Sequence, residues 1–191
     1  ETVFLSSPED LLTLAKQCSL DSWSRGKRVI LTEDLDLEGI GFSPIPTFGG
    51  TFDGQGHTIS GLTLAGEGNV QGLFRYLQPT GIVQDLIVEG YLEPSEDTAQ
   101  LGGIAGCNQG TLMRCSFYGV VRGRECIGGI AGLNGAQGQI INCSFGGFAT
   151  GQHSVGGIAG ENCGSIIQCE NAGKINTTRV EATLDRGTLN L

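Results

Sequence analysis

The chain repeats one arrangement of apolar and polar positions along most of its length. The string Gly-Gly-Ile-Ala-Gly begins at residues 102, 128 and 156, and each copy is followed by an asparagine, a glycine and a cysteine. Aligned on that cysteine, the frame extends backward to six copies, whose reference column reads Leu35, Leu62, Leu86, Cys115, Cys143, Cys169. The column two residues later reads Leu37, Leu64, Val88, Phe117, Phe145, Asn171, and two further on lie Gly39, Gly66, Gly90, Gly119, Gly147, Gly173. We therefore expect six copies of one structural unit.

Apolar residues two positions apart within each copy indicate β-strands, because a helix would place its apolar partners three and four apart. The column glycines are separated by 27, 24, 29, 28 and 26 residues. Units of this size cannot bury an apolar face alone, so neighbouring copies must stack. The sequence predicts an all-β fold, a right-handed parallel β-helix (solenoid) of about six coils in which equivalent residues form interior columns.

The two ends differ from the repeat. Ser7, Pro8 and the acidic residues after them are typical of a helix start, and Leu11, Leu14, Ala15 and Cys18 follow at helical spacing. We expect a short helix over residues 7–18 that covers the open end of the first coil. The predicted organisation is a capping segment at 1–24, β-helix repeats at 25–175, and a segment at 176–191 that either caps the other end or begins a following segment.

Composition supports a packed β-fold and excludes several partner classes. The chain of 191 residues contains 33 glycines, too many for a helical bundle, while 39% hydrophobic and 16% charged residues argue against disorder. A net charge of −9 makes nucleic acid an unfavourable partner. No apolar run approaches the roughly 18 residues of a membrane span, so we expect no membrane insertion.

Two motifs with chemical potential have simpler structural interpretations. Cys115, Cys143 and Cys169 continue an aliphatic column that contains no histidine, so we expect buried free thiols rather than a metal site; a disulfide between adjacent coils is the alternative. Asp53 and His57 flank a glycine-rich stretch that we interpret as a turn, with the aspartate accepting backbone hydrogen bonds. We expect no cofactor.

Other parallel β-helices are polysaccharide lyases or hydrolases, so this enzyme class has to be considered. Hydrolysis of a polysaccharide requires two carboxylates that face one another. In the alignment above, the two outward columns read Asp36, Thr63, Ile87, Ser116, Ser144, Glu170 and Glu38, Ala65, Glu89, Tyr118, Gly146, Ala172. Neither column holds adjacent carboxylates, and Asp85 with Arg114 is expected to form a surface ion pair. We therefore expect no catalytic residues. The alternative hypothesis is that the chain is a polysaccharide lyase or hydrolase. The candidate ligand contacts are aromatic residues, namely Tyr76, Tyr91, Tyr118, Phe148.

The repeats resemble the GLUG motif of large bacterial surface proteins, and the stretch from Gly50 to Leu62 resembles the segment that precedes such repeats. The resemblance covers about residues 1–175. It implies a right-handed β-helix in a secreted or wall-attached protein, such as an adhesin or the non-catalytic part of certain immunoglobulin A peptidases. We accordingly expect a structural or adhesive module that binds a host or cell-surface protein or glycan. Its expected location is extracellular or on the cell surface, with a leader peptide outside this sequence and further domains in the parent chain.

Overall fold

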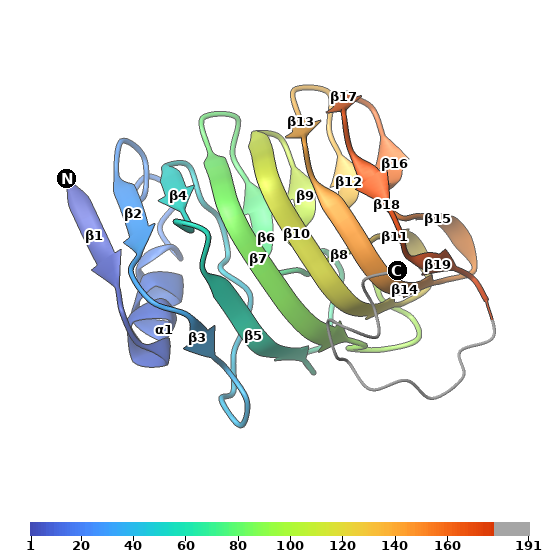
Figure 1. The fold of residues 1–191 in the computed structure, drawn as a ribbon, viewed down its shortest axis with the longest axis horizontal. Helices are drawn as coiled ribbons and strands as arrows, with labels where there is room; N and C mark the ends of the chain where they lie inside the picture. Colours follow the sequence, from blue (N-terminus) through green and yellow to red (C-terminus); the bar gives the residue numbers. More distant parts are fainter. Residues whose placement is uncertain (178–191) are drawn as a thin grey trace.

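The computed structural model describes residues 1–177, which form a solenoid of about six coils with parallel strands (Figure 1). Full coils contribute to three sheets that enclose one apolar interior. The predicted all-β parallel β-helix is therefore confirmed. Residues 178–191, which include most of the predicted C-terminal segment 176–191, lie outside the described residues.

The three sheets differ in length. The strands of the long sheet are β1 (Thr2–Leu5), β2 (Arg28–Leu31), β3 (Leu35–Asp36), β4 (Thr51–Asp53), β5 (Thr58–Leu64), β7 (Ile82–Leu92), β10 (Thr111–Arg122), β13 (Gln139–Ile141), β14 (Ser144–Thr150), β17 (Ser165–Ile167), β18 (Glu170–Asn171) and β19 (Lys174–Ile175). The second sheet contains β6 (Phe74–Leu77), β9 (Ala105–Asn108), β12 (Ala131–Asn134) and β16 (Ala159–Asn162). The third contains β8 (Ala99–Gly102), β11 (Glu125–Gly128) and β15 (His153–Gly156).

The predicted N-terminal helix is present as α1 (Pro8–Gln17). The Ser7 hydroxyl accepts a hydrogen bond from the backbone N–H of Asp10, and Leu11 and Leu14 are buried against the interior. The sequence did not indicate β1, which precedes the helix and pairs in parallel with β2 at the edge of the long sheet. The first coil is thus closed by a strand and a helix together.

The predicted interior columns are correct from the third coil onward. Cys115 lies opposite Leu86, and Phe117 lies opposite both Val88 and Phe145. These side chains are fully buried, and the rings of Phe117 and Phe145 stack with centroids 6.3 Å apart and an interplanar angle of 12°. Asn171 occupies the same column in the last described coil.

The alignment of the first two coils is wrong. Leu62 lies opposite Gly90 rather than Leu86, and Leu35 lies opposite Ile59 rather than Leu62. The alignment matched Gly66 with Gly90, whereas Ile59 lies opposite Val88 and Leu62 lies opposite Gly90, so the predicted register was wrong by four or five residues. A β-bulge at Gly61 accounts for one residue of this difference, because the register of β5 against β7 shifts by one between Ile59 and Leu62. A bulge adds a residue to one strand without changing the apolar pattern of its neighbours.

The Gly-Gly-Ile-Ala-Gly motif makes the corner between the third and second sheets. A Cβ atom on Gly103 would lie 2.4 Å from the Phe117 ring, and one on Gly129 would lie 2.3 Å from the Phe145 ring. The isoleucine that follows is buried in each of these two copies, as Ile104 and Ile130. The second glycine of the motif therefore creates the space that the stacked phenylalanine rings fill.

An asparagine ladder connects the last three coils. Asn108 and Asn134 are fully buried, and the Asn108 Nδ2 atom donates to the Asn134 Oδ1 atom at 2.9 Å. Asn134 in turn donates to the Asn162 Oδ1 atom at 2.8 Å. The ladder satisfies amides that would otherwise be buried without partners.

Candidate functional site

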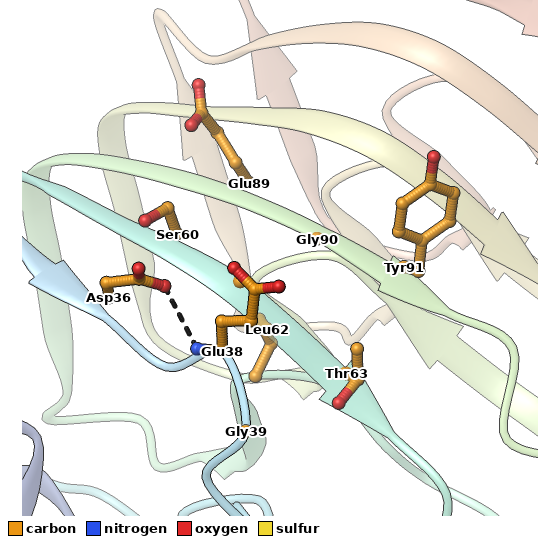
Figure 2. A pocket seen from close by; sticks show the side chains of 10 residues that line it. Asp36, Glu38, Gly39, Ser60, Leu62, Thr63, Glu89, Gly90 and Tyr91 are labelled. Carbon is orange, nitrogen blue, oxygen red and sulfur yellow. Dashed lines mark hydrogen bonds between the residues drawn. The ribbon is translucent and has the colours of Figure 1, made fainter. Parts of the chain in front are cut away.

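The strongest candidate for a binding site is a groove on the outer face of the long sheet, at the bulge in β5. Side chains alternate between the two faces of a strand, so Glu89 and Tyr91 in β7 both point outward while Gly90 faces inward. Figure 2 shows these two side chains on the same side of β7, with Ser60 and Thr63 of β5 beside them. We call this feature the bulge groove; it is lined by Asp36, Glu38, Gly39, Ser60, Gly61, Leu62, Thr63, Glu89, Gly90, Tyr91.

The bulge makes room for the groove. Gly61 adopts φ +69°, and a Cβ atom there would lie 2.7 Å from both the Asp36 Oδ1 atom and the Glu38 nitrogen. The Glu38 N–H donates to Asp36 Oδ1 at 2.9 Å, which fixes the turn that follows β3 (Figure 2). This local packing leaves an open hollow with a volume of about 390 Å³ between the turn and β7.

The chemistry of the bulge groove is acidic and aromatic. Its described lining residues include the carboxylates of Asp36, Glu38 and Glu89 but no lysine, arginine or histidine. Ser60 and Thr63 add hydroxyl groups, and Tyr91 is 38% exposed. The groove therefore offers hydrogen-bond acceptors, hydroxyls and an aromatic ring to a ligand.

The predicted placement of Asp36 and Glu89 in different outward columns is wrong. In the observed register, Ser60 lies opposite Asp36 on one side and next to Glu89 on the other, so these three residues belong to one outward row. Asp36 and Glu89 thus stand on strands two apart in the same row, whereas the sequence alignment placed them in different columns. The alignment missed this row because it matched Gly66 with Gly90, which displaced this part of β5 by five residues against β7.

The four candidate aromatic contacts do not form one site. Tyr91 lines the bulge groove, and Tyr118 lies opposite Glu89 on the next strand. Phe148 continues the outward row of Tyr91, with Val120 between them. Tyr76 lies on β6 in the second sheet and is remote from the row in sheet topology. Three of the four predicted residues therefore share the outer face of the long sheet.

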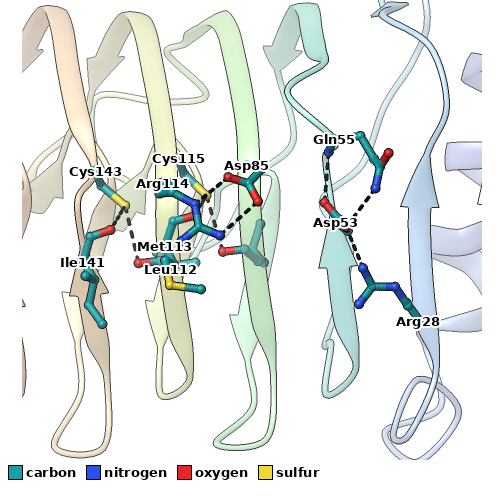
Figure 3. A network of polar contacts seen from close by, with 11 residues as sticks. Arg28, Asp53, Gln55, Asp85, Leu112, Met113, Arg114, Cys115, Ile141 and Cys143 are labelled. Atoms are coloured by element: carbon teal, nitrogen blue, oxygen red, sulfur yellow. Dashed lines mark hydrogen bonds and ion pairs between the residues drawn. The ribbon is translucent and has the colours of Figure 1, made fainter.

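The Asp53 motif is a turn, as predicted. The Asp53 Oδ1 atom accepts from the Gln55 N–H at 3.0 Å, and its Oδ2 atom accepts from Arg28 at 2.7 Å (Figure 3). His57 contacts Asp34 rather than Asp53, with 3.1 Å between Nδ1 and Oδ1. The motif therefore organises a corner of the coil and does not assemble a carboxylate–imidazole pair.

The predicted ion pair between Asp85 and Arg114 is also present. The Arg114 Nε and Nη2 atoms donate to the two Asp85 oxygens at 2.6 and 3.1 Å (Figure 3). These hydrogen bonds lower the pKa of the Asp85 carboxyl below its usual value of 3.8. Both side chains remain partly exposed, so the pair contributes under about 1 kcal/mol to stability.

The cysteines are free thiols in the described residues. Cys115 and Cys143 are buried neighbours in the interior column, and hydrogen bonding with Cys143, together with burial, raises the pKa of Cys115. Residues 1–177 contain no group of three or more histidine, cysteine, aspartate or glutamate side chains arranged to hold a metal ion. Within the same residues, no helix has the length and apolar character needed to cross a membrane.

Comparisons with known proteins agree with this architecture. Residues 123–150 match the family model described as the GLUG motif. Halomucin from Haloquadratum walsbyi (strain DSM 16790 / HBSQ001) is 31% identical over 145 residues, which cover 66% of this chain and 2% of halomucin. A crystal structure described as a "putative immunoglobulin A1 protease" from Bacteroides ovatus matches with a TM-score of 0.65 at 16% identity, covering 94% of this chain and 79% of that one. The motif, the relative and the fold together support a GLUG-repeat β-helix protein.

Proposed function

We propose that the chain is a non-catalytic adhesive module of a larger cell-surface protein and that it binds a glycan in the bulge groove. The observation that carries this proposal is the half-exposed ring of Tyr91 beside outward hydroxyl and carboxylate groups. A sugar has an apolar C–H face that packs on an aromatic ring and a rim of hydroxyls that need hydrogen-bond partners. The groove presents both kinds of partner to a ligand.

The GLUG motif and the similarity to halomucin support a role at the cell surface. The matched segment amounts to 2% of halomucin's length, which fits a module within a much larger protein. A solenoid suits this role because its stacked coils hold an extended face rigid without a large globular core.

The pairing of the strands favours a glycan over an extended peptide. Peptides commonly bind sheets by adding a strand at an open edge. β7 pairs with β5 on one side and β10 on the other, so its backbone beneath Glu89 and Tyr91 is not free to pair with a peptide. Side chains on the face of the sheet must therefore provide the contacts.

A glycan-binding screen with the purified chain tests the proposal. We expect the wild-type chain to bind at least one cell-surface glycan, and Tyr91→Ala to weaken that binding about tenfold or more, as expected for loss of a stacking platform. Tyr76→Ala is the matched control, because it removes the same side chain from another sheet. Absence of binding to every glycan, or equal losses in the two variants, would contradict the proposal.

The shared row of Asp36 and Glu89 makes a polysaccharide hydrolase or lyase the second candidate function, because paired carboxylates perform such reactions. The chain should be incubated with uronate-containing and neutral glycans, with and without calcium. Turnover that persists through repurification and disappears in Glu89→Gln would establish catalysis and refute the non-catalytic proposal.

A further inference from the structure

We infer that copies of this chain associate head to tail, with the free edge of β17 in one copy pairing in parallel with the free edge of β1 in the next. These strands are the two ends of the long sheet, because within residues 1–177 β1 pairs only with β2 and β17 pairs only with β13. β1 lies at the end of the solenoid where the chain starts, and β17 belongs to the last described coil (Figure 1). The contact uses none of the residues that line the bulge groove, so it is independent of glycan binding.

Neither edge carries the residues that normally prevent strands of different molecules from pairing. Edge strands are usually protected by charged side chains, proline or bulges. β1 reads Thr-Val-Phe-Leu and β17 reads Ser-Ile-Ile, and both pair with their inner neighbours in regular register. In the same last coil, β16, β18 and β19 each contain a charged residue, namely Glu161, Glu170, Lys174. β17 is therefore an unprotected edge at one end of the long sheet, as β1 is at the other.

The outward side chains of the two edges are both apolar and belong to one row. The observed register connects Phe4 to Ile167 through one residue in each of β2, β4, β7, β10 and β13. Phe4 is 62% exposed and Ile167 is 48% exposed, although both side chains are large and apolar. If β1 of the next copy takes the place of a further strand beyond β17, these two side chains lie side by side. The contact then removes apolar surface of both from water.

The backbone groups on the two edges are complementary in the same register. The Leu5 carbonyl accepts a hydrogen bond from the residue that follows β2, so alternation along the strand leaves the Phe4 N–H on the free edge. The Ile167 carbonyl accepts from the residue that follows β13, which leaves the Ile166 carbonyl on the free edge of β17. With Phe4 opposite Ile167, the Phe4 N–H can donate to the Ile166 carbonyl, as in any parallel ladder.

Two different edges meet in this contact, so it is heterologous and does not close on itself. Each added copy presents a new free β1 or β17 edge to the next one. We therefore expect linear assemblies that lengthen as the concentration of the chain rises.

Sedimentation velocity on the purified chain, over a wide range of concentration, tests this association. The sedimentation coefficient of the wild-type chain should rise with concentration. Phe4→Lys and Ile167→Lys each place a charge on one edge, and each alone should weaken self-association about tenfold or more. Leu20→Lys is the matched control, because Leu20 is 61% exposed but lies outside the strands, and this variant should associate like the wild type.

A mixture of the two edge variants tests the direction of pairing. Phe4→Lys copies keep an intact β17, and Ile167→Lys copies keep an intact β1. The mixture should therefore form heterodimers at wild-type strength, and these heterodimers should not grow further. Circular dichroism spectra and melting curves establish that each variant is folded.

Four results would overturn the head-to-tail contact. The first is a wild-type chain that stays monomeric at every concentration. The second is self-association of either edge variant alone at wild-type strength, which would indicate pairing between two identical edges. The third is a mixture of the edge variants that associates no better than either variant alone. The fourth is equal weakening by Leu20→Lys, which would indicate non-specific apolar association.

Discussion

Replacing Phe117 by alanine tests the packing on which the solenoid depends. Phe117 is fully buried, stacks on Phe145 with ring centroids 6.3 Å apart, and fills the space beside Gly103. Truncation removes the ring from this column and leaves a cavity that a stack of parallel strands cannot easily close. We expect a loss of about 3–5 kcal/mol in the free energy of unfolding.

The adjacent residue provides the control. Tyr118 is in the same strand but points outward, so Tyr118→Ala should cost under about 1 kcal/mol. For a chain of this size, the expected fall in melting temperature is about 6–20 °C for Phe117→Ala and a few degrees at most for Tyr118→Ala. Urea denaturation followed by circular dichroism gives the free energies, and thermal melts give the temperatures.

A double-mutant cycle isolates the contact between the rings. Phe117→Leu and Phe145→Leu keep most of the apolar volume and remove the stacking, so the coupling energy should be about 0.5–1.5 kcal/mol. Equal and small losses at residues 117 and 118, or a coupling of zero, would refute the assignment of this column as the principal core.

Four further predictions follow from the ends, thiols and corners. Deleting residues 1–18 should lower stability and promote self-association, because it removes β1 and the buried face of α1. A monomer in light scattering, together with an unchanged melting temperature in a thermal melt, would contradict this prediction. Reductant should leave the melting temperature unchanged because the described cysteines are free thiols. A sharp fall in the melting temperature would indicate disulfide bonds. Val70 has φ +63°, so Val70→Gly should stabilise by about 0.5–1 kcal/mol, whereas Val155→Gly, in ordinary strand conformation, should destabilise. Asp85→Asn should cost under about 1 kcal/mol at pH 7. Arg114 lowers the pKa of Asp85, so this difference should begin to shrink near pH 4 and vanish once the pH falls below the lowered pKa; a difference that persists at still lower pH would contradict the ion-pair explanation.

The sequence predicted the fold and the later columns because their chemistry repeats. The apolar spacing that placed Leu86 and Cys115 in one column depends only on strand periodicity. The same reasoning failed at Leu62, because matching Gly66 with Gly90 displaced the second coil by four residues, and the one-residue bulge at Gly61 has no apolar signature of its own. Tyr91 was named as a candidate ligand contact, but the row of carboxylates beside it was missed because of the same misalignment.

The corners show a second limit of the sequence. Gly119 and Gly147 have positive φ, but both lie inside strands, in β10 and β14. One corner of the coils instead stacks four residues with φ between +51° and +54°, none of them glycine: Asp85, Arg114, Asn142, Gln168. Such residues adopt this conformation only when surrounding structure imposes it. Here the hydrogen-bonded strands on either side of the corner impose the positive φ. The sequence of one coil does not show these strand pairings.

The asparagine ladder constrains how such a chain can change in length during evolution. The distance from the first glycine of the motif to its asparagine is 6 residues in every copy, whereas the distance from the asparagine to the cysteine is 7, 9 and 7. An insertion before the asparagine would pull a buried amide out of the ladder, while an insertion after it only enlarges a corner. The two extra residues after Asn134 lie at that corner and leave its bonds to Asn108 and Asn162 intact. Whole coils can therefore be duplicated and corners can be lengthened. The segment from the first glycine of the motif to the asparagine must keep its length of six residues in every copy.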